Sequence, residues 1–172
     1  MAKKCVFLDR DGVLNVDRGD YTYLVEDFVI VKGVAEALRM LHEAGYLLVV
    51  ITNQAGIAKG RYSIADMHRC HEYLQQQTGS LVDKFYFSPY HPDYSESLTR
   101  KPDSLMFEKA IAKFDIDVSA SWMIGDKHRD LEPARKLGIS TIQVDGRDDG
   151  IANYVTDNIL SAAHYILSPA NQ

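Results

Sequence analysis

Side chains able to hold a cation and a phosphate group stand at four separate places along the 172-residue sequence. They are Asp9 with Asp11, Thr52, Lys101, and Asp126 with Asp130. Carboxylates gathered in one site repel one another unless a cation lies among them, and oxygen ligands favour a hard ion. Mg²⁺ fits, because it accepts a few carboxylate or carbonyl oxygens and commonly bridges to a substrate phosphate. The residue types therefore predict a magnesium site, provided that the fold brings the four places together.

The elements between these residues predict that they meet. Short apolar runs alternate with helix-period stretches, which indicates an α/β fold with a doubly wound, mainly parallel sheet. The predicted strands are residues 5–8, 47–51, 85–87, 122–124 and 141–144. Ligands of such sheets bind beyond the carboxyl ends of the strands, where most of the candidate residues stand. A chance turn around Asp9 and Asp11 would leave Thr52, Lys101 and Asp126 unexplained.

Helices are predicted in the gaps between the strands. An apolar stripe covers residues 34–44, and Ser63 with Asp66 resembles a capping box that opens the next helix. Three further helices are predicted at residues 105–114, 131–137 and 158–167, and residues 168–172 are expected to form a frayed tail. Residues 14–33 then form only a flap, and residues 54–100 hold one helix, one strand and a loop. No cap domain is therefore expected.

Composition excludes several classes of protein. The sequence has 19 Lys and Arg residues and 24 Asp and Glu residues, which gives a formal net charge of -5. Because it also has no basic cluster, nucleic acid is not expected as a partner. No apolar stretch approaches the ~20 residues that a membrane span needs, and the first apolar run meets Asp9 too early for a signal peptide. The 2 cysteines favour a reducing, cytoplasmic setting. At this length, residues 1–172 are expected to form one domain.

Four sequence motifs, in order, resemble those of the haloacid dehalogenase (HAD) superfamily of aspartate-nucleophile phosphatases. They are Phe7-Leu8-Asp9-Arg10-Asp11-Gly12-Val13, Ile51-Thr52-Asn53, Lys101-Pro102 and Gly125-Asp126-Lys127-His128-Arg129-Asp130. The resemblance covers nearly the whole chain. It implies a HAD-like Rossmannoid fold and a Mg²⁺-dependent phosphomonoesterase that forms an aspartyl-phosphate.

The resemblance also implies a role for each motif residue. Asp9 would attack phosphorus, and Asp11 would serve as the acid for the leaving alkoxide and then as the base for the attacking water. Thr52 would hold phosphoryl oxygens, and Lys101 would neutralise charge on the nucleophile and the phosphate. The implied magnesium ligands are Asp9, Asp11 through its carbonyl, and Asp126, with Asp130 orienting the group rather than ligating the ion.

The loops around the motifs resemble one capless branch of the superfamily, which contains heptose 1,7-bisphosphate 7-phosphatases and histidinol-phosphate phosphatases. Residues 9–17, residues 52–60 and Arg100 carry this resemblance. The implied substrate contacts are Arg10, Asp17, Arg18, Gly19, Asp20, Asn53, Gln54, Ala55, Arg100 and Lys127. Arg100 offers a bidentate fork for a second phosphate, and carboxylates of the flap can accept sugar hydroxyls. The expected reaction removes the 7-phosphate of D-glycero-D-manno-heptose 1,7-bisphosphate, and histidinol phosphate is the alternative substrate.

One feature of that branch is missing. Many of its members hold a structural zinc with three Cys and one His in the loop before the third motif. The matching positions here are Ser88, Tyr90, Ser97 and Thr99, which offer no thiolate or imidazole. No structural zinc is therefore expected, and the neighbouring His91 is expected to pack the loop.

Two rival interpretations come from other classes of protein. A receiver-type signalling domain also places acidic residues, a Thr and a Lys at strand ends, but Asp11 and the loop at residues 53–56 argue against it. A silent scaffold is disfavoured because every residue that the chemistry needs is present. His68 and His71 lack a third ligand nearby in the sequence and are interpreted as packing residues rather than metal ligands. Four aromatic residues in and beside the flap are also expected to pack: Tyr21, Tyr23, Phe28 and Tyr62. A monomer is expected, since nothing in the sequence demands a partner.

Overall fold

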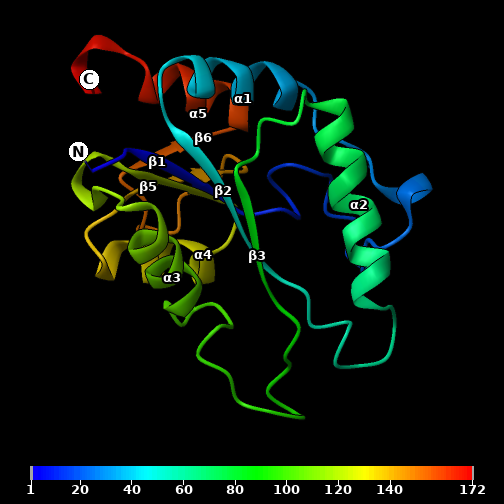
Figure 1. Cartoon of the computed structure of the whole chain (residues 1–172). Coiled ribbons are helices and arrows are strands. Elements are labelled where there is room, and N and C mark those ends of the chain that lie inside the picture. Colours follow the sequence, from blue (N-terminus) through cyan, green and yellow to red (C-terminus); the bar gives the residue numbers. More distant parts are fainter. Residues whose placement is uncertain (1, 172) are drawn as a thin grey trace.

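The computed structural model describes residues 2–171, in which parallel strands form a six-stranded sheet (Figure 1). The strands are β1 (Cys5–Leu8), β2 (Leu47–Asn53), β3 (Lys84–Ser88), β4 (Trp122–Gly125), β5 (Ser140–Val144) and β6 (Tyr154–Thr156). Their order is β3-β2-β1-β4-β5-β6, and every neighbouring pair is parallel. The predicted doubly wound sheet is confirmed. Only β6 is missing from the prediction, because its three half-buried residues form no apolar run.

Helices cover both faces of this sheet (Figure 1). They are α1 (Val34–Glu43), α2 (Ile64–Gln77), α3 (Leu105–Phe114), α4 (His128–Lys136) and α5 (Ile159–Ile166), with 3₁₀ turns at Val25–Asp27, Val118–Ala120 and Pro169–Asn171. Helices α1 and α5 pack together on one face, and α3 and α4 lie on the other (Figure 1). Among the described residues, no helix combines the length and the apolar composition that crossing a bilayer requires.

The central strands are buried on both sides and divide the core in two. Val6 and Leu8 of β1 pack into a cluster with residues of α1, α2 and α5, whereas Cys5 and Phe7 pack into a second cluster with residues of α3 and α4. This alternation follows from the two-residue period of a strand. Asp9 is the first residue after β1. It therefore lies at the switch point of the sheet, where β1 has β2 on one side and β4 on the other.

Side-chain caps set where the helices begin. The predicted capping box is confirmed, because the Asp66 N–H donates to Ser63 Oγ while Asp66 Oδ2 accepts the Ser63 N–H at 2.8 Å. Helix α4 begins at His128, three residues before the predicted start at residue 131. The reason is Asp130, whose Oδ2 accepts the Lys127 N–H at 3.1 Å and so satisfies a free donor of the first turn.

The end of the chain differs from the expected frayed tail at residues 168–172. Residues Pro169–Asn171 form a 3₁₀ turn, and the Asn171 side chain donates from Nδ2 to the Tyr165 carbonyl at 2.8 Å. That amide ties the turn to α5, an interaction between residues six positions apart that local periodicity does not indicate. Residue 172 lies outside the described part of the chain.

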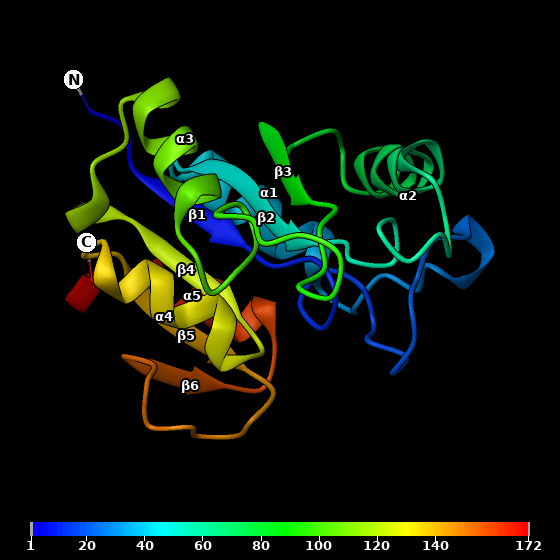
Figure 2. The same cartoon turned by 90° about the horizontal axis from the view of Figure 1, so that it is seen from below.

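No cap domain covers the carboxyl edge of the sheet within residues 2–171. A flap between β1 and α1, the loop before α2 and the loop before α3 lie there instead, on the same side of the molecule (Figure 2). A hydrogen bond connects two distant parts of the flap, because the Val16 N–H donates to the Val29 carbonyl at 2.8 Å. Its aromatic rings pack as predicted, since Tyr23 stacks on Tyr62 with ring centroids 5.1 Å apart and Tyr21 lies 5.8 Å from the same ring.

Candidate active site

Four chain segments meet at the carboxyl edge of the sheet. Asp9 follows β1, Thr52 belongs to the end of β2, and Asp126 follows β4. Lys101 reaches them from the loop before α3, where its Nζ lies 2.8 Å from Asp9 Oδ1 and donates to the Ile51 carbonyl at 2.7 Å. The Lys101 side chain is 1% exposed, so the sequence-distant lysine and nucleophile candidate form a buried ion pair.

Asp130 is the second partner of this lysine. Its Oδ1 lies 2.7 Å from Lys101 Nζ, and its Oδ2 accepts the Lys127 N–H. Burial alone lowers the pKa of Lys101, but the Asp130 and Asp9 carboxylates raise it above its ordinary value, so the ammonium keeps its proton. Both Asp130 oxygens are thus engaged by the protein.

Three buried carboxylates gather beside the lysine. Ligand atoms of Asp9, Asp126 and Asp130 all lie within 4.8 Å of one another, and Asp126 Oδ1 has no hydrogen-bond partner among the described residues. Burial and then the neighbouring carboxylates raise the pKa of Asp9 to about 6 and that of Asp126 to about 7. A hard divalent cation matches this donor set, since it supplies the positive charge that one lysine does not.

Gly12 makes the close approach of Asp126 possible. A Cβ at Gly12 would lie 2.3 Å from Asp126 Oδ2, and the residue has a φ of +90°, a left-handed value that glycine adopts without strain. The glycine of the first motif therefore clears space for the carboxylate of the fourth.

Asp11 is not part of this trio, and its carboxylate is surrounded by donors. Arg10 donates to it twice, from Nη2 to Oδ1 at 2.8 Å and from Nε to Oδ2 at 3.2 Å. Asn15 Nδ2 donates to Oδ1 at 3.0 Å and Gln54 Nε2 to Oδ2 at 3.1 Å. This is the environment of an aligned carboxylate, because every neighbour presents a proton to it.

Asn53 fixes the backbone of the third motif. Its Nδ2 donates to the Lys101 carbonyl at 3.0 Å, and its Oδ1 accepts the Lys101 N–H at 3.0 Å. The amide thereby serves as a two-point clamp between the end of β2 and the residue that carries the active-site ammonium. Such a role is invisible in the sequence, where the two residues are 48 positions apart.

A cavity of about 430 Å³ opens beside these groups. All but one of the residues predicted to contact substrate line it: Arg10, Asp17, Gly19, Asp20, Asn53, Gln54, Ala55, Arg100 and Lys127. The exception is Arg18, whose Nη1 pairs with Asp27 Oδ2 at 2.7 Å and which is not part of the lining. The flap thus presents its carboxylates, and not its arginine, to the cavity.

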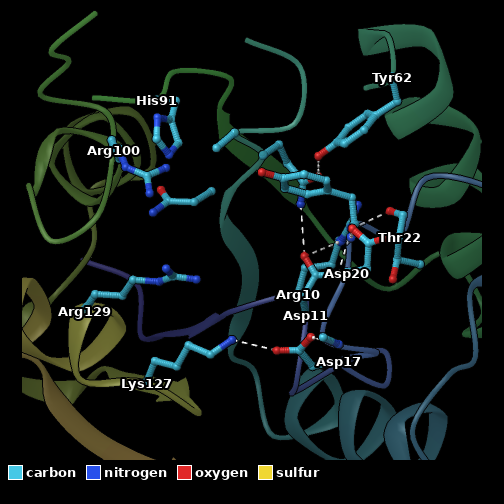
Figure 3. A pocket seen from close by; sticks show the side chains of 15 residues that line it. Arg10, Asp11, Asp17, Asp20, Thr22, Tyr62, His91, Arg100, Lys127 and Arg129 are labelled. Carbon is cyan, nitrogen blue, oxygen red and sulfur yellow. Dashed lines mark hydrogen bonds and ion pairs between the residues drawn. The ribbon is translucent and has the colours of Figure 1, made fainter. Parts of the chain in front are cut away.

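The cavity has one basic side. Figure 3 shows His91, Arg100, Arg129 and Lys127 together on one side, across from Asp11 and the flap. Lys127 Nζ forms an ion pair with Asp17 Oδ2 at 2.7 Å, and this contact lowers the pKa of Asp17. Burial and the Arg129 charge lower the pKa of Arg100. Two neighbouring guanidiniums without a carboxylate partner among the described residues form a natural place for an anion.

Five lining residues were not among the predicted contacts: Tyr21, Thr22, Tyr62, His91 and Arg129. Arg129 lies in the first turn of α4. In the sequence, only its position two residues after the predicted contact Lys127 indicated that it could line the cavity. His91 was expected to pack the loop, yet it also faces the cavity, with its Nδ1 accepting the Asp93 N–H at 3.2 Å. Apart from Arg129, these side chains depend on loop conformations that the sequence pattern does not determine.

Hydroxyl groups occupy three of the loop positions that were matched to zinc ligands by resemblance, Ser88, Ser97 and Thr99. Thr99 Oγ1 donates to Ser88 Oγ at 3.0 Å and lies 2.7 Å from Ser97 Oγ. Ser88 is the last residue of β3 and is fully buried, so the chain of hydroxyls ties the loop to the sheet. Arg100 follows Thr99 directly and therefore lies between this tie and the Asn53 clamp.

His68 and His71 lie away from the cavity, on α2. His71 stacks on Phe85 with ring centroids 4.4 Å apart, and burial lowers its pKa to about 3. Within the described residues, the sole cluster of three or more potential metal-ligating carboxylate, thiol or imidazole groups is the aspartate trio. The packing interpretation of the two histidines agrees with this arrangement.

Comparison with known proteins agrees with this geometry. Residues 98–157, which include the third and fourth motifs, match a family model described as HAD-hydrolase-like. The D-glycero-beta-D-manno-heptose-1,7-bisphosphate 7-phosphatase of Haemophilus ducreyi is 41% identical over 150 residues, which cover 82% of each chain. The protein of the same name from Vibrio cholerae is 36% identical over 97% of this chain and 98% of its own length.

Solved structures agree as well. The D,D-heptose 1,7-bisphosphate phosphatase from B. bronchiseptica, solved with magnesium and phosphate, has a TM-score of 0.89 and 27% identity over 95% of this chain and 98% of that one. The corresponding phosphatase from Burkholderia thailandensis has a TM-score of 0.71 and 27% identity over 96% and 99% of the two chains. The chain therefore belongs to the haloacid dehalogenase-like family of phosphoric monoester hydrolases, in which these heptose bisphosphate phosphatases are its relatives.

Proposed function

We propose that this enzyme removes the 7-phosphate from D-glycero-D-manno-heptose 1,7-bisphosphate and releases heptose 1-phosphate and inorganic phosphate. The observation that carries the proposal is the pairing of two anion-binding regions. Lys101 and the buried carboxylates form an inner region, which does not line the cavity itself but contacts its lining residues Asn53 and Lys127. Arg100 and Arg129 line the basic side of the cavity and form an outer region. A substrate with a phosphate at each end suits both regions. The names of the relatives support the same substrate.

The inner region supplies the groups for phosphoryl transfer. Asp9 attacks phosphorus and becomes an aspartyl-phosphate while the sugar oxygen leaves with a proton from Asp11. Water then attacks the same phosphorus and gives a proton to Asp11, and the electron pair of the breaking bond returns to Asp9. Thr52 and the Asn53 N–H hold phosphoryl oxygens, and the Lys101 ammonium stabilises the charge that develops on them.

Mg²⁺ is the cofactor that fits the aspartate trio. We propose that Asp9, Asp126 and the Asp11 carbonyl hold it, because Asp130 is already engaged by Lys101 and by the Lys127 N–H. When bound, the ion supplies positive charge to the phosphoryl oxygens and relieves the repulsion between the carboxylates. The partner-free Asp126 Oδ1 and the raised pKa values of Asp9 and Asp126 support this assignment.

The outer region distinguishes the two candidate substrates. Arg100 and Arg129 favour a second phosphate, and they disfavour the ammonium group that histidinol phosphate carries in its place. Asp17 and Asp20 of the flap line the cavity with Lys127, which supports a role for them in binding sugar hydroxyls. The hydroxyl-rich, doubly anionic heptose therefore matches both sides of the cavity.

The test is phosphate release with Mg²⁺ from heptose 1,7-bisphosphate and, separately, from histidinol phosphate. Wild-type protein should prefer the heptose, Asp9→Asn should release nothing, and Arg100→Ala should lose the preference while it retains turnover. Preference for histidinol phosphate would overturn the substrate assignment and leave the roles of the inner region intact. No release from either ester, with a stable phosphorylated Asp9, would instead favour a receiver-type signalling domain.

We further infer that the protein works in the cytoplasm as a monomer on a small phosphorylated metabolite. The two cysteines, Cys5 and Cys70, are free and buried, in keeping with a reducing compartment. The net charge of -5 disfavours nucleic acid as a partner. We also propose that residues 1–172 act as one catalytic domain, because every proposed catalytic group comes from a single sheet edge. Gel filtration with light scattering tests the monomer.

A further inference from the structure

A buried chain of hydrogen bonds runs from Tyr62 to the acid–base residue. Tyr62 Oη donates to Gln54 Oε1 at 2.6 Å. Gln54 Nε2 in turn donates to Asp11 Oδ2 at 3.1 Å and to Thr52 Oγ1 at 2.9 Å. Gln54 is 2% exposed and Tyr62 is 8% exposed, so water does not readily replace the hydrogen bond between these two side chains. The amide nitrogen of one buried side chain therefore donates to both Asp11 and Thr52, while its oxygen is held by Tyr62.

The Tyr62 hydroxyl supports the orientation that the Gln54 amide adopts. The Asp11 carboxylate only accepts, so it requires Nε2 on its side, and Oε1 then faces Tyr62, whose hydroxyl donates to it. A hydroxyl can donate or accept, so neither Thr52 nor Tyr62 selects the orientation by itself, but loss of the Tyr62 donor leaves Oε1 without this hydrogen bond and the amide less firmly held. Burial raises the pKa of Tyr62 above its ordinary value, so the hydroxyl keeps the proton that it donates. A reversed amide would place Oε1 against the Asp11 carboxylate.

We propose that Tyr62 is a positioning residue that acts through Gln54 and holds Asp11 as an aligned carboxylate for the hydrolysis of the phosphorylated enzyme. The inference rests on the proposed roles of Asp9 and Asp11 but not on the identity of the sugar. In that half-reaction, the water oxygen bonds to phosphorus as its proton passes to Asp11. The bond from phosphorus to the Asp9 oxygen breaks, its electron pair returns to the Asp9 carboxylate, and inorganic phosphate leaves.

The aromatic stack offers a matched pair of variants. Tyr62→Phe removes the hydroxyl at the head of the chain and keeps the ring that stacks on Tyr23. Tyr23→Phe removes a hydroxyl from the other ring of the same stack. Tyr23 is not part of the chain of hydrogen bonds and does not line the cavity. Any effect of altered ring packing should be common to both variants, whereas the effect of the hydrogen bond belongs to Tyr62→Phe alone.

The assay is the Mg²⁺-dependent hydrolysis of p-nitrophenyl phosphate, followed from the first turnover. Its leaving group departs without an acid, so the variant should form the phosphorylated enzyme normally and hydrolyse it slowly. We expect Tyr62→Phe to lower kcat about 10-fold, the size of one lost hydrogen bond, with kcat/KM unchanged and a burst of p-nitrophenolate. An unchanged kcat would overturn the inference. So would an equal fall in kcat/KM without a burst, or the same effect in Tyr23→Phe.

A second measurement establishes that Tyr62 acts through Gln54. Gln54→Met removes the amide, and adding Tyr62→Phe to it should lower kcat no further, because both changes break one chain. Additive losses would contradict the chain. Independently of turnover, hydrogen exchange of the Gln54 side-chain amide, followed by NMR, should be slow in wild type and Tyr23→Phe and fast in Tyr62→Phe. A wild type that releases no p-nitrophenol would count against the proposed function and with it the catalytic part of the inference, whereas the amide exchange would still decide whether Tyr62 holds the Gln54 amide.

Discussion

Replacement of Asp126 by Asn should stabilise the magnesium-free protein while it abolishes phosphatase activity. Asp126 is buried with Asp9 and Asp130, and its Oδ1 has no partner among the described residues. Burial and the Asp9 charge raise its pKa from 3.8 to about 7. Because the folded state resists ionisation of this group, stability falls as pH rises from about 4 to about 7 and stays low above that range.

The size of the effect follows from the same shift. One pKa unit corresponds to about 1.4 kcal/mol, so ionised Asp126 destabilises the folded protein by roughly 4 kcal/mol above pH 7. Asparagine removes the charge but leaves a polar group buried, which retains part of the desolvation cost. We therefore expect Asp126→Asn to raise the free energy of unfolding by about 2–4 kcal/mol at pH 8 and by much less at pH 5.

Urea unfolding in EDTA at pH 5 and pH 8 measures the difference in the free energy of unfolding between Asp126→Asn and wild type. The same measurement with Mg²⁺ shows how far the ion removes the advantage of the variant. Ion at about 100 times its Kd should stabilise the wild type by about 2.7 kcal/mol and Asp126→Asn hardly at all. Glu96→Gln, which removes one exposed carboxylate from the loop before α3, controls for net charge. If metal-free Asp126→Asn is no more stable than wild type at pH 8, the idea that these carboxylates repel one another is refuted.

Three further outcomes follow from other contacts. Arg129→Ala should raise KM for heptose 1,7-bisphosphate about 10-fold or more and leave KM for p-nitrophenyl phosphate unchanged, because only the former has a second phosphate; steady-state kinetics decide it. Thr99→Val should raise the same KM several-fold by releasing the loop that carries Arg100, whereas Thr99→Ser, which keeps the hydroxyl bonded to Ser88, should retain the wild-type value. His71 has a pKa lowered to about 3, so the unfolded chain binds its proton first and stability should fall as pH drops below about 6.5; His71→Phe should remove up to about 1.4 kcal/mol per pH unit of that slope in acid urea titrations.

The sequence predicted the groups that depend on strand ends, whereas the residues that it missed or misplaced lie mostly in loops. Asp9, Thr52 and Asp126 lie where they were expected, because the carboxyl ends of parallel strands share one edge whatever the details of packing. Arg18 was expected at substrate but pairs with Asp27, since the path of the flap decides which of its neighbouring side chains face inward. Tyr62 was expected only to pack, and its ring does so.

Helix α4 illustrates the same limit on the fold. The apolar pattern placed its start at residue 131, whereas the helix begins at His128 because the Asp130 carboxylate caps it. Asp130 was assigned to the active site alone, and one residue performs both tasks. The earlier start also places Arg129 in the first helical turn at the cavity. The missed cap and the missed arginine therefore have one cause.

Adjacent residues serve the two ends of the proposed substrate. Lys101 is buried against Asp9, whereas Arg100 lines the outer cavity. The peptide between them is anchored on both sides, by the Asn53 clamp at Lys101 and by the hydroxyls of Ser88 and Thr99. Asn53 and Ser88 are register partners on β2 and β3, so both anchors belong to the rigid sheet. The spacing between the two proposed phosphate sites is therefore set by the sheet, and such a spacing would let the enzyme select a bisphosphate by its length.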